Sequence, residues 1–304
     1  MLLLTSFLVD ILLYEEDDEI IFYKNFISKY STMTVSSMVS QLAFLPDTYI
    51  DMTKETLDND IENLIKSIPQ AAERRRQAYP YYTLAAGIDS EEIIQNEEKR
   101  SFITEAFYKK TEKYNLTSRE MILRELNSST FLNYFFIIED TLKNIYFQNT
   151  NSNEHIGSSK LISKILEGIL KYKDIKNIFE AELNIRSKFF INFASLNRMW
   201  KLLNFIRNRL VHFNGYYDDE AISLFIQYYE NILKMYDNND SMLISISYFI
   251  DIIEKYKEQI EKTNYLIIDD TLENIIRNIS IFIMESLYIS EKNANKTLER
   301  NSLP

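Results

Sequence analysis

The chain has no cysteine, and it has only four glycines, four prolines and two histidines among 304 residues. Without cysteine, disulfides, thiolate nucleophiles and cysteine-ligated zinc sites are excluded. Few glycines and prolines mean few turns that need a positive or fixed φ, which favours long helices joined by short polar loops. Two histidines far apart in the sequence do not favour a metal site, and we expect neither a metal nor an organic cofactor.

Long apolar runs suited to a membrane are also missing. Residues 1–14 are apolar, but no basic region precedes the apolar stretch and it contains Asp10, so it makes a poor signal peptide. The runs 242–253 and 279–289 each contain a carboxylate and are too short to span a bilayer. We therefore expect a cytoplasmic protein without membrane contacts, and we interpret residues 1–14 as a core element, either a helix or a short strand.

The composition is that of a folded protein. Hydrophobic residues make up 46% of the chain and charged residues 26%, which is typical of a globular protein with a sizeable core. The net charge is −11, and this acidic balance argues against nonspecific coating of nucleic acid, which needs a basic face. A local basic site is still compatible with it.

Apolar residues recur at helical spacing along most of the chain. In residues 52–68 they include Leu57, Ile61 and Leu64, and Pro69 follows as a stop. Thr117 and Glu120 have the spacing of a capping box, which predicts a helix start. Further helices are expected from Asp89 and over 132–147, 159–172, 175–185, 189–213, 218–236, 241–262 and 271–289, with a polar loop at 149–158 and a frayed tail from 290.

These patterns predict an all-α fold. We expect a helical bundle over residues 126–262, preceded by an additional N-terminal helical region over 1–125 and followed by a C-terminal helix and tail over 263–304. The acidic run Glu15–Glu19 is interpreted as a helix N-terminus, where negative charge is favoured, with metal binding as the alternative.

The helix expected over 189–213 carries the most informative side chains. On a helical wheel of about 100° per residue, its apolar residues fall within about 120° of arc. Asn208 and His212 share the opposite side, and Arg207 lies at the margin. The predicted core stripe consists of Leu196, Met199, Leu202, Leu203, Ile206, Leu210 and Phe213.

His212 has an unusual position for a structural histidine. A lone histidine is more often structural than catalytic, but a structural one usually lies on or beside the core stripe. His212 faces away from the stripe, close to Gly215, where the helix is expected to end and where the helix dipole favours a cationic imidazole. An Arg that holds a phosphate and a His that moves a proton are sufficient to cut RNA without a metal.

The motif Arg207-Asn208, with His212 four residues after the Asn, resembles the R-x4–6-H motif of the HEPN (higher eukaryotes and prokaryotes nucleotide-binding) superfamily. In that family, Asn, Asp or His often follows the Arg. The segment Phe136–Leu142 is similar to the family's first helix, which often carries an acidic residue, here Glu139. Residues 200–203 and 214–215 around the motif are similar as well. The resemblance covers about residues 130–260 and implies a HEPN-like helical bundle.

What the resemblance implies is a metal-independent endoribonuclease that works as a homodimer, with two copies of the motif at one cleft. Arg207 would bind the phosphate, His212 would move the proton, and Asn208 would orient the imidazole or the RNA. Glu139 would support His212 or cap a local Arg. The products would carry 2′,3′-cyclic phosphate and 5′-OH ends. The family often acts in antiphage defence or toxin–antitoxin systems, so the expected partners are RNA (tRNA or mRNA) and an antitoxin or regulatory protein.

One departure from the family pattern concerns such antitoxins. Toxins of this superfamily that pair with a nucleotidyltransferase often have a Tyr two residues after the His, but here that position is Asn214. Because some family members have lost catalysis, the alternative function is a non-catalytic helical scaffold that binds RNA or a protein through the same dimer face. A nucleotide-binding regulator is a third interpretation.

Other basic residues are weaker candidates. Arg74, Arg75 and Arg76 precede several tyrosines and could hold RNA by phosphate contacts and stacking, although a solvated helix end is the simpler explanation. Arg209 could add charge beside the motif. His155 lies in the polar loop and is interpreted as an exposed loop residue.

Overall fold

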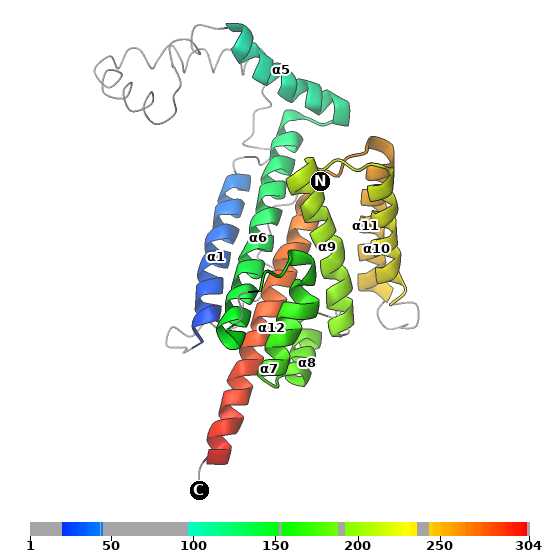
Figure 1. The fold of residues 1–304 in the computed structure, drawn as a ribbon. Coiled ribbons are helices and arrows are strands. Elements are labelled where there is room, and N and C mark those ends of the chain that lie inside the picture. The colour runs from blue at the N-terminus through cyan, green and yellow to red at the C-terminus, as the bar shows by residue number, and fades with distance from the viewer. Residues whose placement is uncertain are drawn as a thin grey trace, which may run out of the picture. The chain divides into compact units, whose positions relative to one another are not determined.

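The computed structural model describes residues 20–42, 44, 97–151, 154–187, 192–235 and 243–302. Over these residues the structure is all-α, which confirms the predicted fold class, and the only β-type pairing is an isolated bridge between Tyr216 and Tyr265 (Figure 1). The α-helices are α1 (Ile21–Leu42), α5 (Glu97–Tyr114), α6 (Ser118–Thr150), α7 (Glu167–Tyr172), α8 (Lys176–Arg186), α9 (Phe193–Phe213), α10 (Asp219–Leu233), α11 (Leu243–Thr263) and α12 (Asp270–Ser302).

The chain divides into two compact units. One contains α1 and the chain from Arg124 onward, and the other spans Ala43–Leu123. The division between Leu123 and Arg124 lies close to the boundary expected at residue 125, but α1 belongs to the same unit as the bundle that follows. The smaller unit contains α5 and the start of α6. Thr117 and Glu120 form the predicted capping box there. The backbone N–H of Thr117 donates to the Glu120 carboxylate at 3.0 Å, and the backbone N–H of Glu120 donates to the Thr117 hydroxyl at 3.2 Å.

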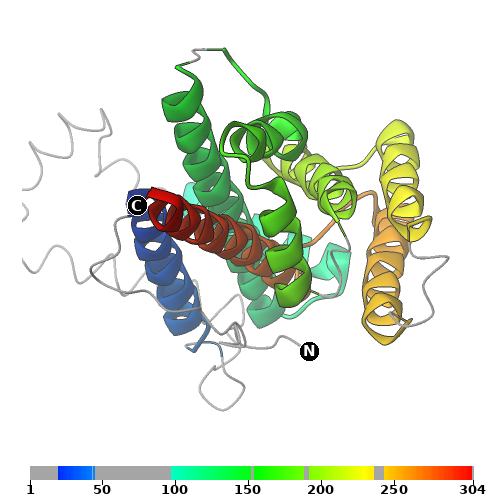
Figure 2. The same cartoon turned by 90° about the horizontal axis from the view of Figure 1, so that it is seen from below.

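In the larger unit, α1 and α6 run antiparallel. The two helices lie side by side and run in opposite directions (Figures 1 and 2). Side-chain hydrogen bonds connect them at successive levels, and the residue number falls on α6 as it rises on α1. α12 packs against α1 and also against α8 on another side, which places it in the middle of the unit. The pairs between α1 and α6 are Lys29 with Asp140, Thr34 with Tyr134, Ser37 with Thr130 and Gln41 with Asn127.

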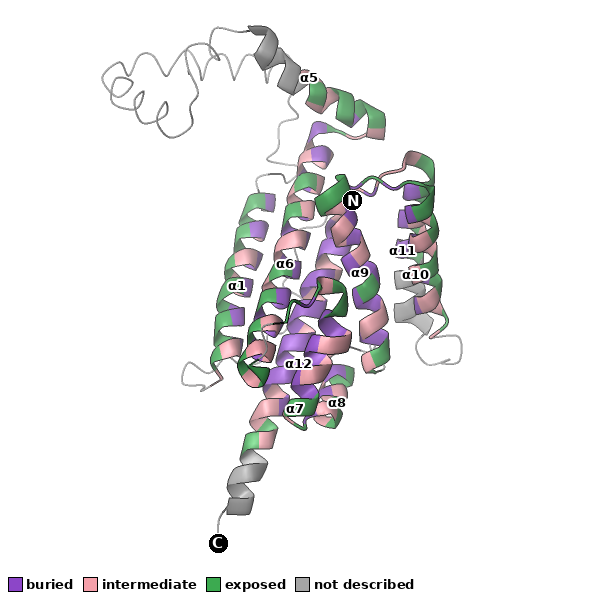
Figure 3. Ribbon diagram, viewed as in Figure 1, coloured by how far each residue is buried: buried purple, intermediate pink, exposed green. Residues whose placement is uncertain are grey.

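The central position of α12 explains its burial. Most of its apolar side chains from Leu272 to Tyr288 are buried, with Ile275 and Phe282 partly buried, and Figure 3 shows much of this stretch in the colour of buried residues. The helix also continues into the segment from residue 290 that was expected to fray. Ser290 is fully buried, and the Glu291 carboxylate forms an ion pair with the Lys173 ammonium group at 2.8 Å. The expected frayed tail from residue 290 is therefore wrong, because these residues are packed against the chain after α7.

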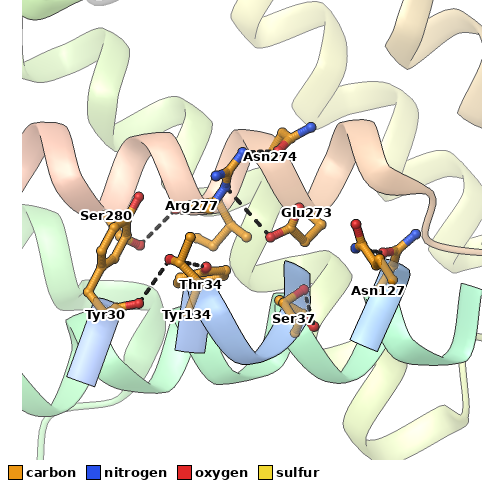
Figure 4. A network of polar contacts seen from close by, with 12 residues as sticks. Tyr30, Thr34, Ser37, Asn127, Tyr134, Glu273, Asn274, Arg277 and Ser280 are labelled. Carbon is orange, nitrogen blue, oxygen red and sulfur yellow. Dashed lines mark hydrogen bonds and ion pairs between the residues drawn. The ribbon is translucent and has the colours of Figure 1, made fainter. Parts of the chain in front are cut away.

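Polar side chains are buried where α1, α6 and α12 meet (Figure 4). Thr34 and Tyr134 share a hydrogen bond of 2.6 Å, and the Glu273 carboxylate lies 3.7 Å from the Arg277 guanidinium one turn later on α12. Burial raises the pKa of Glu273 to about 7, even though the cation of Arg277 acts in the opposite direction. The desolvation of this carboxylate therefore outweighs its ion pair.

The segment expected as one helix over 159–172 has three parts. It begins with a 3-10 turn (Ser158–Lys160), continues as a π-helix (Leu161–Leu166) and ends as α7. Gly168 packs closely here, since a Cβ at this position would lie 2.6 Å from a ring carbon of Tyr146. The helices predicted over 175–185, 189–213, 218–236 and 241–262 are present, with ends shifted by a few residues. The helix start predicted at Thr117 and the helix predicted over 132–147 belong to the single helix α6, and the helix predicted over 271–289 continues to Ser302. The expected helices over 52–68 and from Asp89, and the element over 1–14, lie outside the described residues.

No helix in the described part of the chain is both long and apolar enough to cross a membrane.

Candidate functional site around the end of helix α9

Helix α9 has well-defined ends. Asn192 and Ser195 form a reciprocal capping box at its start, with the backbone N–H of Ser195 bonded to the Asn192 side chain at 3.0 Å. At its other end Asn214 adopts a left-handed conformation with φ 51°, and Gly215 follows with φ 75°. The helix therefore stops one residue after His212, close to the end predicted at Gly215.

The turn after α9 is tied to the start of the segment that leads into α12. The N–H of Tyr217 donates to the carbonyl of Asn264 at 2.7 Å, and the carbonyl of Gly215 accepts from Leu266 at 3.1 Å. A Cβ on Gly215 would lie 3.1 Å from the carbonyl oxygen of Leu266. Glycine is thus required here by both its positive φ and the close backbone approach, and the turn is held in one position.

The wheel predicted most of the buried face of α9. Five of the seven predicted stripe residues, from Leu196 to Ile206, are at most 1% exposed. The last two depart from it: Leu210 is partly buried, and Phe213 has 50% of its surface exposed at the helix end. α10 packs on α9 and α11 packs on α10, so this side of the unit is a layer of three neighbouring helices (Figure 1).

Arg207 lies against α6. Its guanidinium carbon is 5.7 Å from the ring centre of Phe135 and 5.2 Å from that of Phe136. One guanidinium N–H donates to the side-chain oxygen of Asn208 at 2.9 Å. The Nε of Arg207 is enclosed and has no hydrogen-bond partner among the described residues. The cation is therefore held by two rings and one amide, with hydrogen-bonding capacity left over.

His212 is exposed at the last turn of α9. Its neighbours in sequence, Val211 and Phe213, are 42% and 50% exposed, and Tyr216 in the following turn is 41% exposed. Large apolar side chains at the surface are common singly, but a group of them beside polar side chains is typical of a contact surface. The end of α9 around His212 therefore has the composition of a contact surface.

Arg207 and His212 do not meet within one chain. Five residues on a helix correspond to a rise of about 7.5 Å and a rotation of about 140°. The contacts of Arg207 in the described residues are with α6 and Asn208, and none joins it to His212. A single copy of α9 therefore presents the two side chains in different directions.

Arg209 is buried, and its charge is satisfied internally. It is 8% exposed, its Nε donates to the carbonyl of Tyr216 at 2.8 Å, and its Nη2 lies 3.3 Å from an Asp218 oxygen. The guanidinium also stacks on the Phe213 ring at 4.1 Å. Arg209 thus fastens the turn after α9, and we assign it no part in binding RNA. Its wheel position, about 60° from Ile206, is beside the core stripe and could have indicated this.

Glu139 lies away from the motif. It is buried on α6, where it pairs with Lys143 and accepts a hydrogen bond from Ser158, both at 2.5 Å. The carbonyl of Ser158 in turn accepts from the indole of Trp200, which precedes Arg207 by about two helical turns. Glu139 therefore belongs to a polar link between α6 and the middle of α9, and its contacts in the described residues do not include His212.

The remaining basic candidates fall elsewhere. Arg74, Arg75 and Arg76 lie outside the described residues. His155 is exposed between α6 and the 3-10 turn, as interpreted from the sequence. The side chains that the sequence analysis missed are Phe135 and Phe136, which contact Arg207 from a helix about 70 residues earlier. The spacing of apolar residues around Phe135 and Phe136 predicted a helix there, but it did not indicate which other helix the two rings would contact.

Within the described residues, no three His, Cys, Asp or Glu side chains gather closely enough to hold a metal ion. Comparison of the chain with models of protein families, with curated proteins and with solved structures found no match. The likeness to the HEPN superfamily is therefore a resemblance that rests on the motif and its place at the end of α9.

Proposed function

We propose that this protein is a metal-independent endoribonuclease of the HEPN type. It would cut RNA, such as tRNA or mRNA, in antiphage defence or as the toxin of a toxin–antitoxin pair. An antitoxin or regulatory protein would then hold it inactive. The observation that carries the proposal is an exposed His212 on the same helix end as Arg207, whose guanidinium has a single hydrogen bond among the described residues.

The reaction assigns one task to each side chain. The ribose 2′-oxygen attacks the adjacent phosphorus and loses its proton, while the bond from phosphorus to the 5′-oxygen breaks and that oxygen gains a proton. The products are a 2′,3′-cyclic phosphate and a 5′-OH. His212 moves the proton at one of these oxygens, and Arg207 neutralises the charge that builds on the phosphate oxygens. Because the 2′-oxygen is the nucleophile, DNA is not a substrate.

The arrangement of α9 favours a site composed of two chains. In one chain Arg207 turns toward α6, whereas His212 is exposed one turn and a half later. The apolar side chains around His212 supply a surface that a second copy can cover. A homodimer that packs these helix ends together would bring His212 of one protomer toward Arg207 of its partner, and it would shield the reacting phosphate from water.

The test is cleavage of RNA by the purified protein in EDTA. We expect shorter RNAs with 5′-OH ends and cyclic phosphates, and no product from DNA of the same sequence. His212→Ala and Arg207→Ala should each lower the rate by at least about 100-fold. Tyr172→Ala, a change at an exposed residue on α7, is the matched control and should keep the wild-type rate.

The second candidate function is a non-catalytic scaffold that uses the same face to bind RNA or a protein. The separation of Arg207 and His212 within one chain favours it, because no single copy assembles a reaction centre. Intact RNA after long incubation, together with a dimer that the His212→Ala change leaves unaltered, would favour the scaffold. Cleavage by His212→Ala protein at the wild-type rate would also remove the catalytic proposal.

A further inference from the structure

Phe136 is a large apolar side chain that the fold leaves 42% exposed. Its neighbour Phe135 is fully buried and stacks on Trp200, with ring centres 4.4 Å apart and planes inclined by 25°. Phe135 is therefore fixed by the core, and its role in the packing is clear. The burial of Phe136 is incomplete, so hydrophobic packing alone gives a weak reason for an aromatic ring there.

The ring of Phe136 faces a cation. The guanidinium carbon of Arg207 is 5.2 Å from its centre and 5.7 Å from that of Phe135, both within the range of a cation–π contact. Aromatic rings attract a guanidinium without using its N–H groups. The two rings thus fix the position of Arg207 without occupying its terminal N–H groups, of which one donates to Asn208 and the others are left for an anion.

The hydrogen bonding of Arg207 supports this reading. A guanidinium has five N–H donors, and in the described residues only the bond to Asn208, at 2.9 Å, uses one of them. Arg209, two residues later, contrasts with this because it donates to Tyr216 and pairs with Asp218. Of these two neighbouring cations, Arg209 is buried and held by a hydrogen bond and an ion pair within the fold, whereas Arg207 is held mainly by rings.

We propose that Phe136 is a positioning residue that holds the Arg207 guanidinium, through its ring face, in the orientation that receives a phosphate of single-stranded RNA. The effect of Phe136 on cleavage rests on the ribonuclease function proposed above. An unsupported arginine at a surface samples many rotamers, and each binding event must then select one of them. A ring that fixes the guanidinium beforehand removes that selection.

The experiment distinguishes the effect of the aromatic face of Phe136 from the effect of its apolar volume. Phe136→Leu keeps an apolar side chain but removes the π face, whereas Phe136→Trp keeps and enlarges the face. We expect Phe136→Leu to lower kcat/KM by about 3- to 10-fold, because a loosened guanidinium weakens RNA binding as well as cleavage, and Phe136→Trp to stay near wild type. Tyr172→Leu is the control for loss of an exposed ring elsewhere, and thermal unfolding checks that all three variants fold.

A binding measurement distinguishes this proposal from the ribonuclease proposal. In His212→Ala protein, a fluorescent single-stranded RNA is titrated at several salt concentrations. Loss of one phosphate contact lowers the slope of log affinity against log salt by about 0.7, and we expect this for Phe136→Leu and for Arg207→Ala but not for Phe136→Trp.

Each outcome decides the matter. Equal cleavage and equal salt slopes for wild type, Phe136→Leu and Phe136→Trp would overturn the positioning role while the ribonuclease proposal stands. If wild type binds RNA but does not cut it, the ribonuclease proposal fails and the salt slopes alone decide about Phe136. Absence of both cleavage and RNA binding in wild type overturns both proposals.

Discussion

The side-chain oxygen of Asn208 accepts a hydrogen bond from the guanidinium of Arg207 at 2.9 Å, so within one chain Asn208 supports the arginine. This gives the second residue of the motif a definite task. We predict that Asn208→Ala lowers RNA affinity by a few-fold, because the loss of one charge-assisted hydrogen bond loosens the guanidinium. Binding to a labelled RNA by His212→Ala protein is the measurement.

An acidic substitution at the same position gives the matched comparison. Asn208→Asp keeps the shape and the acceptor but adds a negative charge beside Arg207. It should weaken RNA binding more than Asn208→Ala does, because the carboxylate competes with the phosphate for the same guanidinium. If the aspartate variant bound RNA as tightly as wild type, Arg207 would not be the phosphate ligand.

Arg209 should matter for stability, in contrast to Arg207. It is buried, donates to the Tyr216 carbonyl and pairs with Asp218. We predict that Arg209→Ala lowers the free energy of unfolding by about 2–3 kcal/mol, since two hydrogen bonds of a buried side chain are lost. Arg207→Ala should cost about 1 kcal/mol or less. Urea unfolding followed by circular dichroism compares them, and equal losses would contradict the assignment.

Gly215 should not tolerate a side chain. Its φ is 75°, and a Cβ would lie 3.1 Å from the Leu266 carbonyl oxygen. We predict that Gly215→Ala lowers the free energy of unfolding by about 1–2 kcal/mol. Asn214→Gly is the control, because Asn214 is also left-handed, with φ 51°, and glycine accepts that conformation without strain. A neutral Gly215→Ala variant would mean that the turn shifts freely.

The buried carboxylate of Glu273 predicts a dependence of stability on pH. Burial raises its pKa to about 7 in the folded protein, above its ordinary value of 4.5. A group whose pKa is higher when folded binds its proton more tightly in that state, so its contribution is complete below pH 4.5 and is lost as the pH rises through 7. Between pH 5 and 8 this group alone should remove on the order of 2 kcal/mol of stability.

Several charged and titratable groups face Glu273, so the control must remove the titration of Glu273 alone. Asp270 and Arg277 lie on its own helix, and Tyr30 on α1 and Tyr134 on α6 pack against the same region. Glu273→Gln removes the titration, so the difference in unfolding free energy between pH 5 and pH 8 should shrink. The remaining groups are unchanged in this variant. A pH dependence identical to wild type would show that Glu273 stays ionised throughout.

Much of the fold followed from local patterns. The periodicity over 189–213 predicted the helix, its buried stripe and its end near Gly215, because a helix that packs on one side must carry apolar residues every three to four positions. The Thr117 and Glu120 capping box was also predicted, since both partners lie within one turn. Such features depend on neighbours in sequence, which the sequence displays directly.

Features that depend on distant neighbours were not predicted. The sequence treated Glu139 as a support for His212, but Ser158 and Lys143 engage it instead. The tail after residue 289 has a polar sequence, yet Ser290 is buried because α12 is surrounded by other helices. Polarity indicates a solvated end only when no other element covers it.

By itself, the sequence determined that the described chain is helical, where most of its helices lie and which face of α9 is buried. It also placed Arg207, Asn208 and His212 on one helix end. Only the tertiary structure decided that Arg209 is bonded to the turn after α9, whereas Arg207 lies against two rings of α6 and makes a single hydrogen bond among the described residues. The physical reason is that a side chain's partners come from whichever helix packs beside it, and packing is a property of the whole fold.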